Sequence, residues 1–142
     1  MNFIRKIVQP QSQEDAELYF ELKKLLHFSP RNLYHYKKAF THRSTQEVDQ
    51  KGNPINYERL EFLGDAILGS VISAYLYKQV PTGTEGYLTQ MRSKIVSRKH
   101  LNELGKDLDL IRFVKSNIVE AHISDNIYGN IFEALLGAIY LD

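Results

Sequence analysis

Apolar residues recur at intervals of three and four along almost the whole chain, and this spacing limits the fold more than any other feature. The clearest stripes are Leu18, Leu22, Leu25 and Leu26; Leu60, Leu63, Ile67, Val71 and Ala74; and Ile127, Ile131, Leu135, Ala138 and Ile139. Only Ile111 to Val114 has a composition compatible with a β-strand. We therefore predict an all-α helical bundle that forms one domain over residues 1–142.

Capping residues and helix breakers predict six helices. The predictions are a helix capped by Ser12 that ends near Pro30, a short helix over Leu33 to Phe40, a loop from Thr45 to Pro54, a long helix capped by Asn56 that runs to about Tyr77, a helix capped by Thr84 on Leu88, Met91 and Ile95, a helix around Leu101 and Leu104 that ends before Gly105, and a last helix from Ile127 to Ile139. The apolar pattern is still running at Asp142, so we expect the natural protein to continue beyond this residue.

Composition excludes several classes of protein. Cysteine is absent, which excludes disulfides and thiolate ligands, so that oxygen or histidine must hold any bound metal. The longest nearly apolar stretch, Ala66 to Tyr77, is shorter than a membrane span, and Met1 to Pro10 lacks the features of a signal peptide. We therefore expect a soluble, cytoplasmic protein without a membrane-bound segment.

The charges are balanced overall but unevenly distributed. The formal net charge is +1, which gives no general argument for binding to nucleic acid. Residues 44–66 hold five acids against two bases, whereas residues 86–106 hold five bases against one acid. An acidic segment followed by a basic one suits a metal-bound phosphate substrate, although two ordinary solvated helix faces produce the same counts.

Two pairs of oxygen-bearing side chains share helix faces beside the apolar stripes. Glu61 and Asp65 are four residues apart, and Asn130 and Glu133 are three apart. If their helices pack antiparallel, the two pairs converge, and such hard oxygen donors favour Mg²⁺ or Mn²⁺. The alternative is a set of solvated surface acids. The repulsive acid pair, together with a mid-helix Gly64 that costs about 1 kcal/mol relative to alanine, favours a site.

One of these segments carries a long motif. Asn56 to Leu68, with the sequence NYERLEFLGDAIL, resembles the signature of the ribonuclease III family, the endonucleases that cut double-stranded RNA. Three further blocks agree with the family in the expected order: AFTHRS at 39–44, EGYLT at 85–89 with Arg92, Ser93 and Val96, and FEALLGAIYLD at 132–142. The resemblance therefore extends from about Tyr34 to the end of the chain.

The resemblance implies a homodimeric all-α nuclease domain with one acidic site per subunit, in a valley that holds an RNA duplex. It implies that Glu61, Asn130 and Glu133 hold Mg²⁺, for which Mn²⁺ can substitute, and that Asp65 and Glu133 are catalytic residues. It also implies products with 5′-phosphate and 3′-hydroxyl ends and a short 3′ overhang. Ribosomal and messenger RNA precursors are the expected substrates.

Other positions are expected to contact substrate or the partner subunit. Glu58 and Glu85 resemble acids that flank the cleft, and Phe62 resembles a phenylalanine that enters a pocket of the other subunit. We expect phosphate contacts from four basic side chains: Arg92, Lys94, Arg98 and Lys99. His42 is expected to have a structural role. Nothing in the chain resembles the double-stranded-RNA-binding domain that follows the nuclease domain in this family, and its absence should weaken RNA binding.

Asn130 departs from the family pattern, which has a carboxylate at this position. An asparagine oxygen can bind a cation, but the loss of a full negative charge should lower metal affinity. Natural tolerance, an engineered inactivating change and a degenerate subunit that binds RNA without cutting it all explain this asparagine. The alternative from another functional class is a non-catalytic RNA-binding or scaffold protein built on the same dimer, and a third is a helical metal-binding protein of unrelated function.

Overall fold

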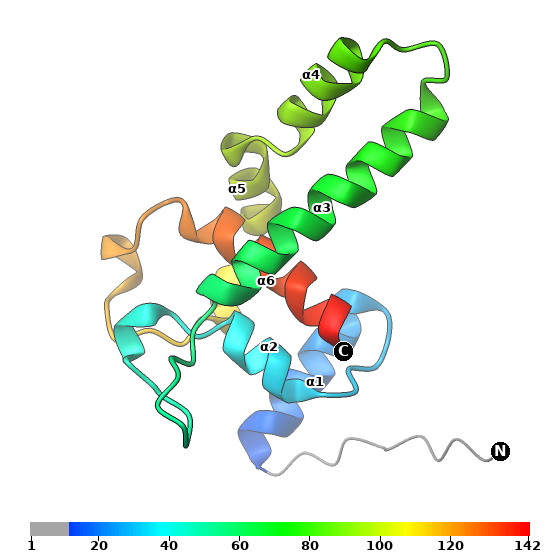
Figure 1. The fold of residues 1–142 in the computed structure, drawn as a ribbon. Coiled ribbons are helices and arrows are strands. Elements are labelled where there is room, and N and C mark those ends of the chain that lie inside the picture. The colour runs from blue at the N-terminus through cyan, green and yellow to red at the C-terminus, as the bar shows by residue number, and fades with distance from the viewer. Residues whose placement is uncertain (1–11) are drawn as a thin grey trace, which may run out of the picture.

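The computed structural model describes residues 12–142 and is helical throughout (Figure 1). The helices are α1 (Gln13–Leu26), α2 (Leu33–Ala39), α3 (Glu58–Gln79), α4 (Glu85–Ile95), α5 (Arg98–Asp107) and α6 (Ile127–Leu141), with 3₁₀ turns η1 (Arg43–Thr45), η2 (Leu110–Phe113) and η3 (Glu120–His122). Within residues 12–142, β pairing is limited to two single bridges, Thr41 with Lys115 and Val48 with Pro54. The all-α prediction is confirmed, while the prediction for Met1 to Pro10 lies outside the described residues.

Two of the predicted capping residues, Ser12 and Thr84, cap their helices, whereas the N-cap of α3 is Tyr57 and not the predicted Asn56. The Ser12 side chain accepts a hydrogen bond from the Asp15 amide, and the Thr84 side chain accepts one from the Tyr87 amide. Asn56 accepts a hydrogen bond from the Glu58 amide at 3.0 Å, so it supports the start of α3 from just outside the helix. Each of these bonds satisfies an amide that the helix itself leaves without a partner.

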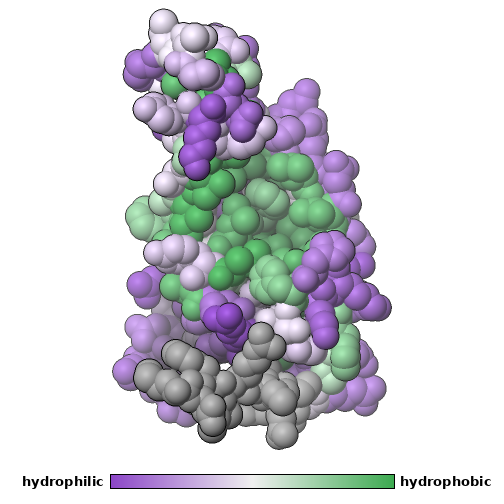
Figure 2. Space-filling view, turned by 90° about the vertical axis from the view of Figure 1, so that its right-hand side faces the viewer, coloured by the Kyte–Doolittle hydropathy of each residue, from purple (hydrophilic) through white to green (hydrophobic). Residues whose placement is uncertain are grey.

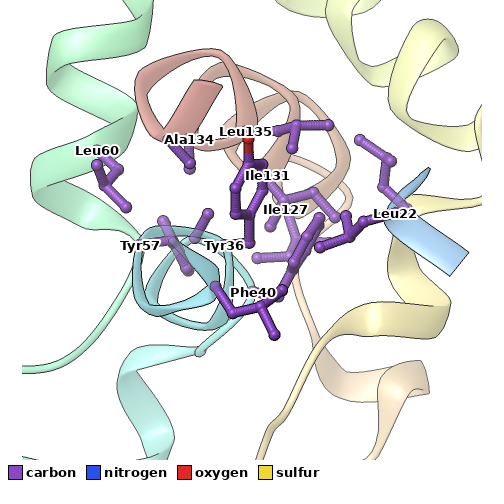
Figure 3. Close-up of a cluster of buried hydrophobic side chains, with 13 residues drawn as sticks. Leu22, Tyr36, Phe40, Tyr57, Leu60, Ile127, Ile131, Ala134 and Leu135 are labelled. Atoms are coloured by element: carbon purple, nitrogen blue, oxygen red, sulfur yellow. The ribbon is translucent and has the colours of Figure 1, made fainter. Parts of the chain in front are cut away.

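The core forms around α6, which contributes Ile127, Ile131, Ala134, Leu135 and Ala138. Figure 3 shows Ile131 and Leu135 gathered with Leu22 of α1 and Tyr36 of α2. All four side chains are buried, which removes a large apolar area from water and stabilises the packing of α1 and α2 on α6. The sequence predicted the stripes of α1 and α6 correctly.

The helices α3 and α6 form the most extensive contact, and glycines allow their backbones to touch. A Cβ atom at Gly64 would lie 1.7 Å from the Glu133 carbonyl oxygen, and one at Gly137 would lie 2.4 Å from the Leu60 carbonyl oxygen. Because residue numbers rise along α6 as they fall along α3, the two helices cross in opposite directions. The predicted antiparallel packing is therefore confirmed.

Two boundary predictions are wrong. Leu110–Phe113 forms a 3₁₀ turn, rather than a strand over Ile111 to Val114, since a buried Leu110 anchors the turn to the core. Helix α5 continues past Gly105 to Asp107. Gly105 is needed inside the helix because an added Cβ atom would lie 2.3 Å from the Tyr128 carbonyl oxygen of α6.

The apolar stripe predicted for α3 is correct only in its first half. Leu60 is buried, but Val71 is 58% exposed and Ala74 is also exposed, while Leu76 is buried. The second half of α3 projects beyond the body of the molecule and packs against α4 (Figure 1), so a different side of the helix turns inward there.

Helix α3 is long and apolar enough to cross a membrane, judged by length and composition alone. Only 17% of its apolar window is buried inside the structure. The sequence prediction counted Ala66 to Tyr77 alone and therefore judged this segment too short. In the folded chain one side of α3 packs on α6 and α4. The other side is an apolar surface without a partner among the described residues of a single chain.

Asp142 fastens the end of α6 to the beginning of α2. Its carboxylate accepts hydrogen bonds from the Arg31 amide at 2.9 Å and from the buried Tyr36 hydroxyl at 3.0 Å. Burial and the Asp142 charge raise the pKa of Tyr36, so the hydroxyl stays protonated and remains a donor. This contact holds α2 in place beneath the core face of α6.

Replacement of Gly64 tests the backbone contact between α3 and α6. We expect Gly64→Ala to lower the free energy of unfolding by at least about 2 kcal/mol, because the new methyl group overlaps the Glu133 carbonyl. Gly86→Ala on α4 is the matched control, since nothing lies within 4 Å of the added atom. Urea unfolding measures both variants. Equal stability of the two variants would contradict the close contact.

Candidate active site

The close contact at Gly64 places acidic side chains of α3 beside α6. Glu61 and Asp65 lie one turn apart on α3 around Gly64, and Glu133 lies directly opposite on α6. Glu133 is only 3% exposed, Glu61 is half-buried and Asp65 is exposed. The sequence places Glu133 beside the apolar stripe of α6, and in the structure it is buried there because α3 covers this part of α6.

Burial changes the protonation of the two inner acids. Loss of solvent raises the pKa of Glu133 to about 7; the nearby Arg98 opposes this change, while the charges of Asp65 and Glu61 add to it. Burial also raises the pKa of Glu61, again against the influence of Arg98. The three carboxylates therefore act on one another electrostatically, as expected of side chains that share a site.

Arg98 lies against the acidic cluster, which consists of Glu61, Asp65 and Glu133. It is the first residue of α5, a helix that Ser97 caps. Its Nη1 atom donates a hydrogen bond to the Asn130 Oδ1 atom at 2.6 Å and lies 3.5 Å from the Glu133 Oε2 atom. The sequence predicts that Arg98 contacts an RNA phosphate. It gives no sign that Arg98 lies beside Asn130 and Glu133, because no periodicity relates the start of α5 to α6.

The donor atoms of the cluster suit a divalent cation. Glu61, Asn130 and Glu133 offer hard oxygen atoms, the ligands that Mg²⁺ prefers. In the part of the chain that the structure describes, however, no three Asp, Glu, His or Cys side chains are placed together as a metal-binding group. Metal binding by Asn130 and Glu133 also requires Arg98 to release its contacts with these two residues.

The predicted flanking acids lie at opposite ends of α3. Glu58 begins α3 and forms a 3.6 Å ion pair with Arg43. Glu85 begins α4 and accepts a 2.8 Å hydrogen bond from Thr89. The α3 segment from Asp65 to its end spans roughly 20 Å at 1.5 Å per residue, so Glu85 does not join the Glu61 cluster within one chain.

The predicted basic residues do not form a single group. Arg92 donates a 2.9 Å hydrogen bond to the Ser73 hydroxyl and thereby connects α4 to α3. Lys94 near the end of α4 and Lys99 near the start of α5 are exposed. The structure thus leaves the two lysines accessible to a phosphate, whereas Arg92 has an internal partner and Arg98 contacts the acidic cluster.

Phe62 is 81% exposed, the highest value among the exposed large hydrophobic residues of the described chain. Gly69 lies two turns further along α3, and a Cβ atom there would meet nothing within 4 Å. Other exposed apolar side chains belong to the same two helices: Val71, Tyr75 and Tyr77 on α3, and Tyr140 and Leu141 on α6. Figure 2 shows a broad hydrophobic area on one face of the molecule, below the projecting end.

His42 has the structural role that the sequence predicted. It is buried, its Nδ1 atom accepts a hydrogen bond from the Ser44 amide at 3.1 Å, and the same atom lies 2.9 Å from the Ser44 hydroxyl. Burial lowers the pKa of His42, which favours the neutral ring that this bond needs.

A separate cavity lies away from these residues. It has a volume of about 740 Å³ and opens between α1, α2 and η2, with Leu18, Phe40 and Phe113 among its apolar lining residues. Glu61, Asp65, Asn130 and Glu133 do not line this cavity. The candidate site therefore lies outside this cavity.

Comparison with known proteins identifies the family. Residues 34–142 match the family described as Ribonuclease-III-like. The chain is 60% identical over 143 residues to Ribonuclease 3 of Flavobacterium psychrophilum and 65% identical over 142 residues to Ribonuclease 3 of Zunongwangia profunda. The chain belongs to the ribonuclease III family. Both alignments cover 100% of the chain but only 58% of each relative, so the chain spans about three-fifths of their length.

Solved structures of the ribonuclease III family share this fold. The nuclease domain of the Campylobacter jejuni enzyme superposes with a TM-score of 0.74 at 30% identity, over 85% of this chain and 83% of that one. The description of that structure refers to a flexible region involved in dimer formation. Dicer from Pichia stipitis has a TM-score of 0.59 at 27% identity, over 78% of this chain and 46% of that one.

The buried Glu133 carboxyl should make stability depend on pH. Its pKa is about 7 in the folded chain against an ordinary value of 4.5, so between these values the folded state binds more protons than the unfolded state. The free energy of unfolding should therefore fall as the pH rises through this window, by about 3 kcal/mol in total. Urea unfolding without divalent metal, at about pH 5 and about pH 8, measures this loss.

Glu133→Gln isolates this contribution because the amide does not ionise. The variant should gain stability relative to the wild type as the pH rises, whereas Glu103→Gln at an exposed position of α5 should follow the wild type. A difference between Glu133→Gln and the wild type that is independent of pH would show that Glu133 titrates as an ordinary carboxyl.

Proposed function

We propose that the chain is the nuclease domain of an endoribonuclease that hydrolyses phosphodiester bonds of double-stranded RNA with the help of Mg²⁺. The observation that carries the proposal is the buried Glu133 carboxyl opposite Glu61 and Asp65 at the crossing of α3 and α6. Burial of a carboxyl that can ionise costs free energy. A bound cation that neutralises the cluster explains why a carboxyl is present at this buried position. Family membership gives independent support.

The residues of the cluster have separate tasks in this proposal. Glu61, Asn130 and Glu133 hold the metal, for which Mn²⁺ can substitute. When bound, Mg²⁺ neutralises charge on the scissile phosphate and lowers the pKa of a water molecule. The exposed Asp65 orients that water and accepts its proton as the water oxygen attacks phosphorus. The bond from phosphorus to the 3′-oxygen breaks and this oxygen takes a proton from solvent water, which leaves 5′-phosphate and 3′-hydroxyl ends.

The proposed substrate is a structured RNA, such as a ribosomal or messenger RNA precursor in the cytoplasm. The exposed Lys94 and Lys99 are placed to contact its phosphates, and Glu58 and Glu85 to flank the bound duplex. In the relatives, two-fifths of the length lies outside the matched chain. We propose that a double-stranded-RNA-binding domain follows in the intact protein and supplies the remaining affinity.

We also propose that the exposed apolar side of α3 pairs with a second copy of the chain. Phe62 and its neighbours on α3 form a surface of the kind that subunits bury, and the Campylobacter jejuni relative is described as dimer-forming. Such burial accounts for an apolar helix surface without a membrane. A dimer also provides two sites, one for each strand of the duplex.

A second function, an RNA-binding dimer that does not cut, is supported by the contact between Arg98 and Asn130. Here a neutral side chain replaces the family carboxylate, and a guanidinium occupies its oxygen atom. A cleavage assay on duplex RNA with and without Mg²⁺ separates the two functions. Metal-dependent cleavage would support the nuclease, and tight binding without cleavage would support the non-catalytic dimer.

Replacement of Asp65 tests the catalytic assignment. We expect Asp65→Asn to reduce cleavage by at least about 100-fold, the usual contribution of a positioned acid or base. Its urea midpoint should equal or exceed that of the wild type, because the change removes repulsion on the α3 surface. Glu103→Gln, which also removes a surface acid, should cleave normally. Normal cleavage by Asp65→Asn would show that Asp65 has no part in the reaction.

Replacement of Phe62 tests the dimer. Phe62→Ala should weaken self-association by about 30-fold, equivalent to roughly 2 kcal/mol, if the ring is an interface anchor. Phe20→Ala, which removes an exposed ring of α1, is the control and should leave association unchanged. Sedimentation equilibrium measures both variants, and an identical dimer constant for Phe62→Ala would refute the assignment of this surface.

A further inference from the structure

The guanidinium of Arg98 uses the oxygen atoms that the proposed metal would use. It donates to Asn130 Oδ1 at 2.6 Å and lies 3.5 Å from Glu133 Oε2, and both acceptors belong to one face of α6. The Glu133 side chain is 4% exposed, whereas the Arg98 side chain is 47% exposed. A half-exposed guanidinium therefore lies against a buried carboxylate.

The backbone of α6 is shaped to receive Arg98. The Gly129 amide donates a 2.9 Å hydrogen bond to Asn102 Oδ1, which fixes α5 against α6 one turn beyond Arg98. A Cβ atom at Gly129 would lie 2.8 Å from that oxygen and 3.2 Å from the Arg98 Nη1 atom. A larger residue at position 129 would therefore crowd Arg98, so the glycine belongs to the same arrangement as Arg98 and Asn130.

The neutral side chain at position 130 determines how firmly Arg98 is held. Arginine pairs with a carboxylate through strong, charge-assisted hydrogen bonds that can form in parallel, whereas an amide oxygen accepts a weaker bond. An aspartate at position 130 would hold both the metal and Arg98 more tightly. With asparagine, the competing contact weakens, and a divalent ion can displace the arginine.

We propose that Arg98 is a tethered cation that occupies Asn130 and Glu133 until a divalent ion displaces it, and that the neutral Asn130 keeps this displacement easy. The inference rests on the proposed metal-dependent function, and it makes Arg98 a positioning residue rather than a phosphate contact in the metal-free state. It also explains why position 130 is an asparagine and not the carboxylate of the family pattern, since Asn130 and Arg98 act as a pair. When the metal displaces it, the Arg98 guanidinium turns toward the solvent, where the substrate would bind.

The first test is Mg²⁺ binding to the chain without RNA, measured by isothermal titration calorimetry. Arg98→Gln should bind Mg²⁺ about tenfold more tightly than the wild type, because no internal cation competes. Arg98→Lys, which keeps the charge, should stay within about threefold of the wild type. Lys106→Gln is the matched control, since it removes one positive charge from the same helix away from the cluster, and it should leave affinity unchanged. Unchanged or weaker Mg²⁺ binding by Arg98→Gln would overturn the proposal.

A double-mutant cycle tests the pair itself. In the wild-type background, Asn130→Asp should raise Mg²⁺ affinity by no more than about threefold, because the new carboxylate also strengthens the contact with Arg98. In the Arg98→Gln background, the same change should raise affinity by about tenfold or more. Equal gains in the two backgrounds would overturn the proposed pairing.

Two controls separate this inference from the proposed function. RNA cleavage by the wild type is measured in parallel, so that a cleaving wild type with no effect of Arg98→Gln on Mg²⁺ binding refutes only the role of Arg98. Tighter Mg²⁺ binding without any RNA cleavage refutes only the nuclease. Should Arg98→Gln fail to fold without metal, Arg98→Met, which replaces the charged group with an unbranched apolar side chain, takes its place with the same expected gain.

Discussion

The contact of the α3 backbone with the α6 backbone is the constraint on which the rest of the structure depends. Gly64 and Gly137 allow each helix to reach a carbonyl of the other, at Glu133 and Leu60. At this separation no side chain fits between the helices, so residues on either side of the contact are forced to its edge or into the core. Glu133 is buried as a result, and Glu61 and Asp65 are held close enough to influence its protonation.

The charge of the site follows from that burial. A carboxyl removed from water resists ionisation, and each neighbouring acid increases this resistance. Arg98 offsets part of the negative charge from α5, and a divalent ion would offset more. Competition between these two cations for the same oxygens gives the neutral Asn130 a function and removes the need to regard it as a defect.

Much of the fold could be predicted from the sequence, because local signals decide helices and caps. Ser12 and Thr84 cap their helices as predicted, and the antiparallel packing of α3 on α6 brings Gly64, between Glu61 and Asp65, against Glu133. Long-range geometry set the rest. Gly105 has the local signature of a helix end, yet it lies inside α5 because α6 approaches there. The position of Arg98 likewise depends on how α5 packs against α6, which no periodicity encodes.

We propose that the crossing of α3 and α6 creates one divalent-cation site. Nuclear magnetic resonance of the isotope-labelled chain during addition of Mn²⁺, a paramagnetic ion, tests this site. Amide signals around Glu61 to Asp65 and Asn130 to Glu133 should broaden first, and excess Mg²⁺ should restore them. Broadening confined to other acidic residues, such as those of α1, or uniform broadening along the chain would contradict the claim.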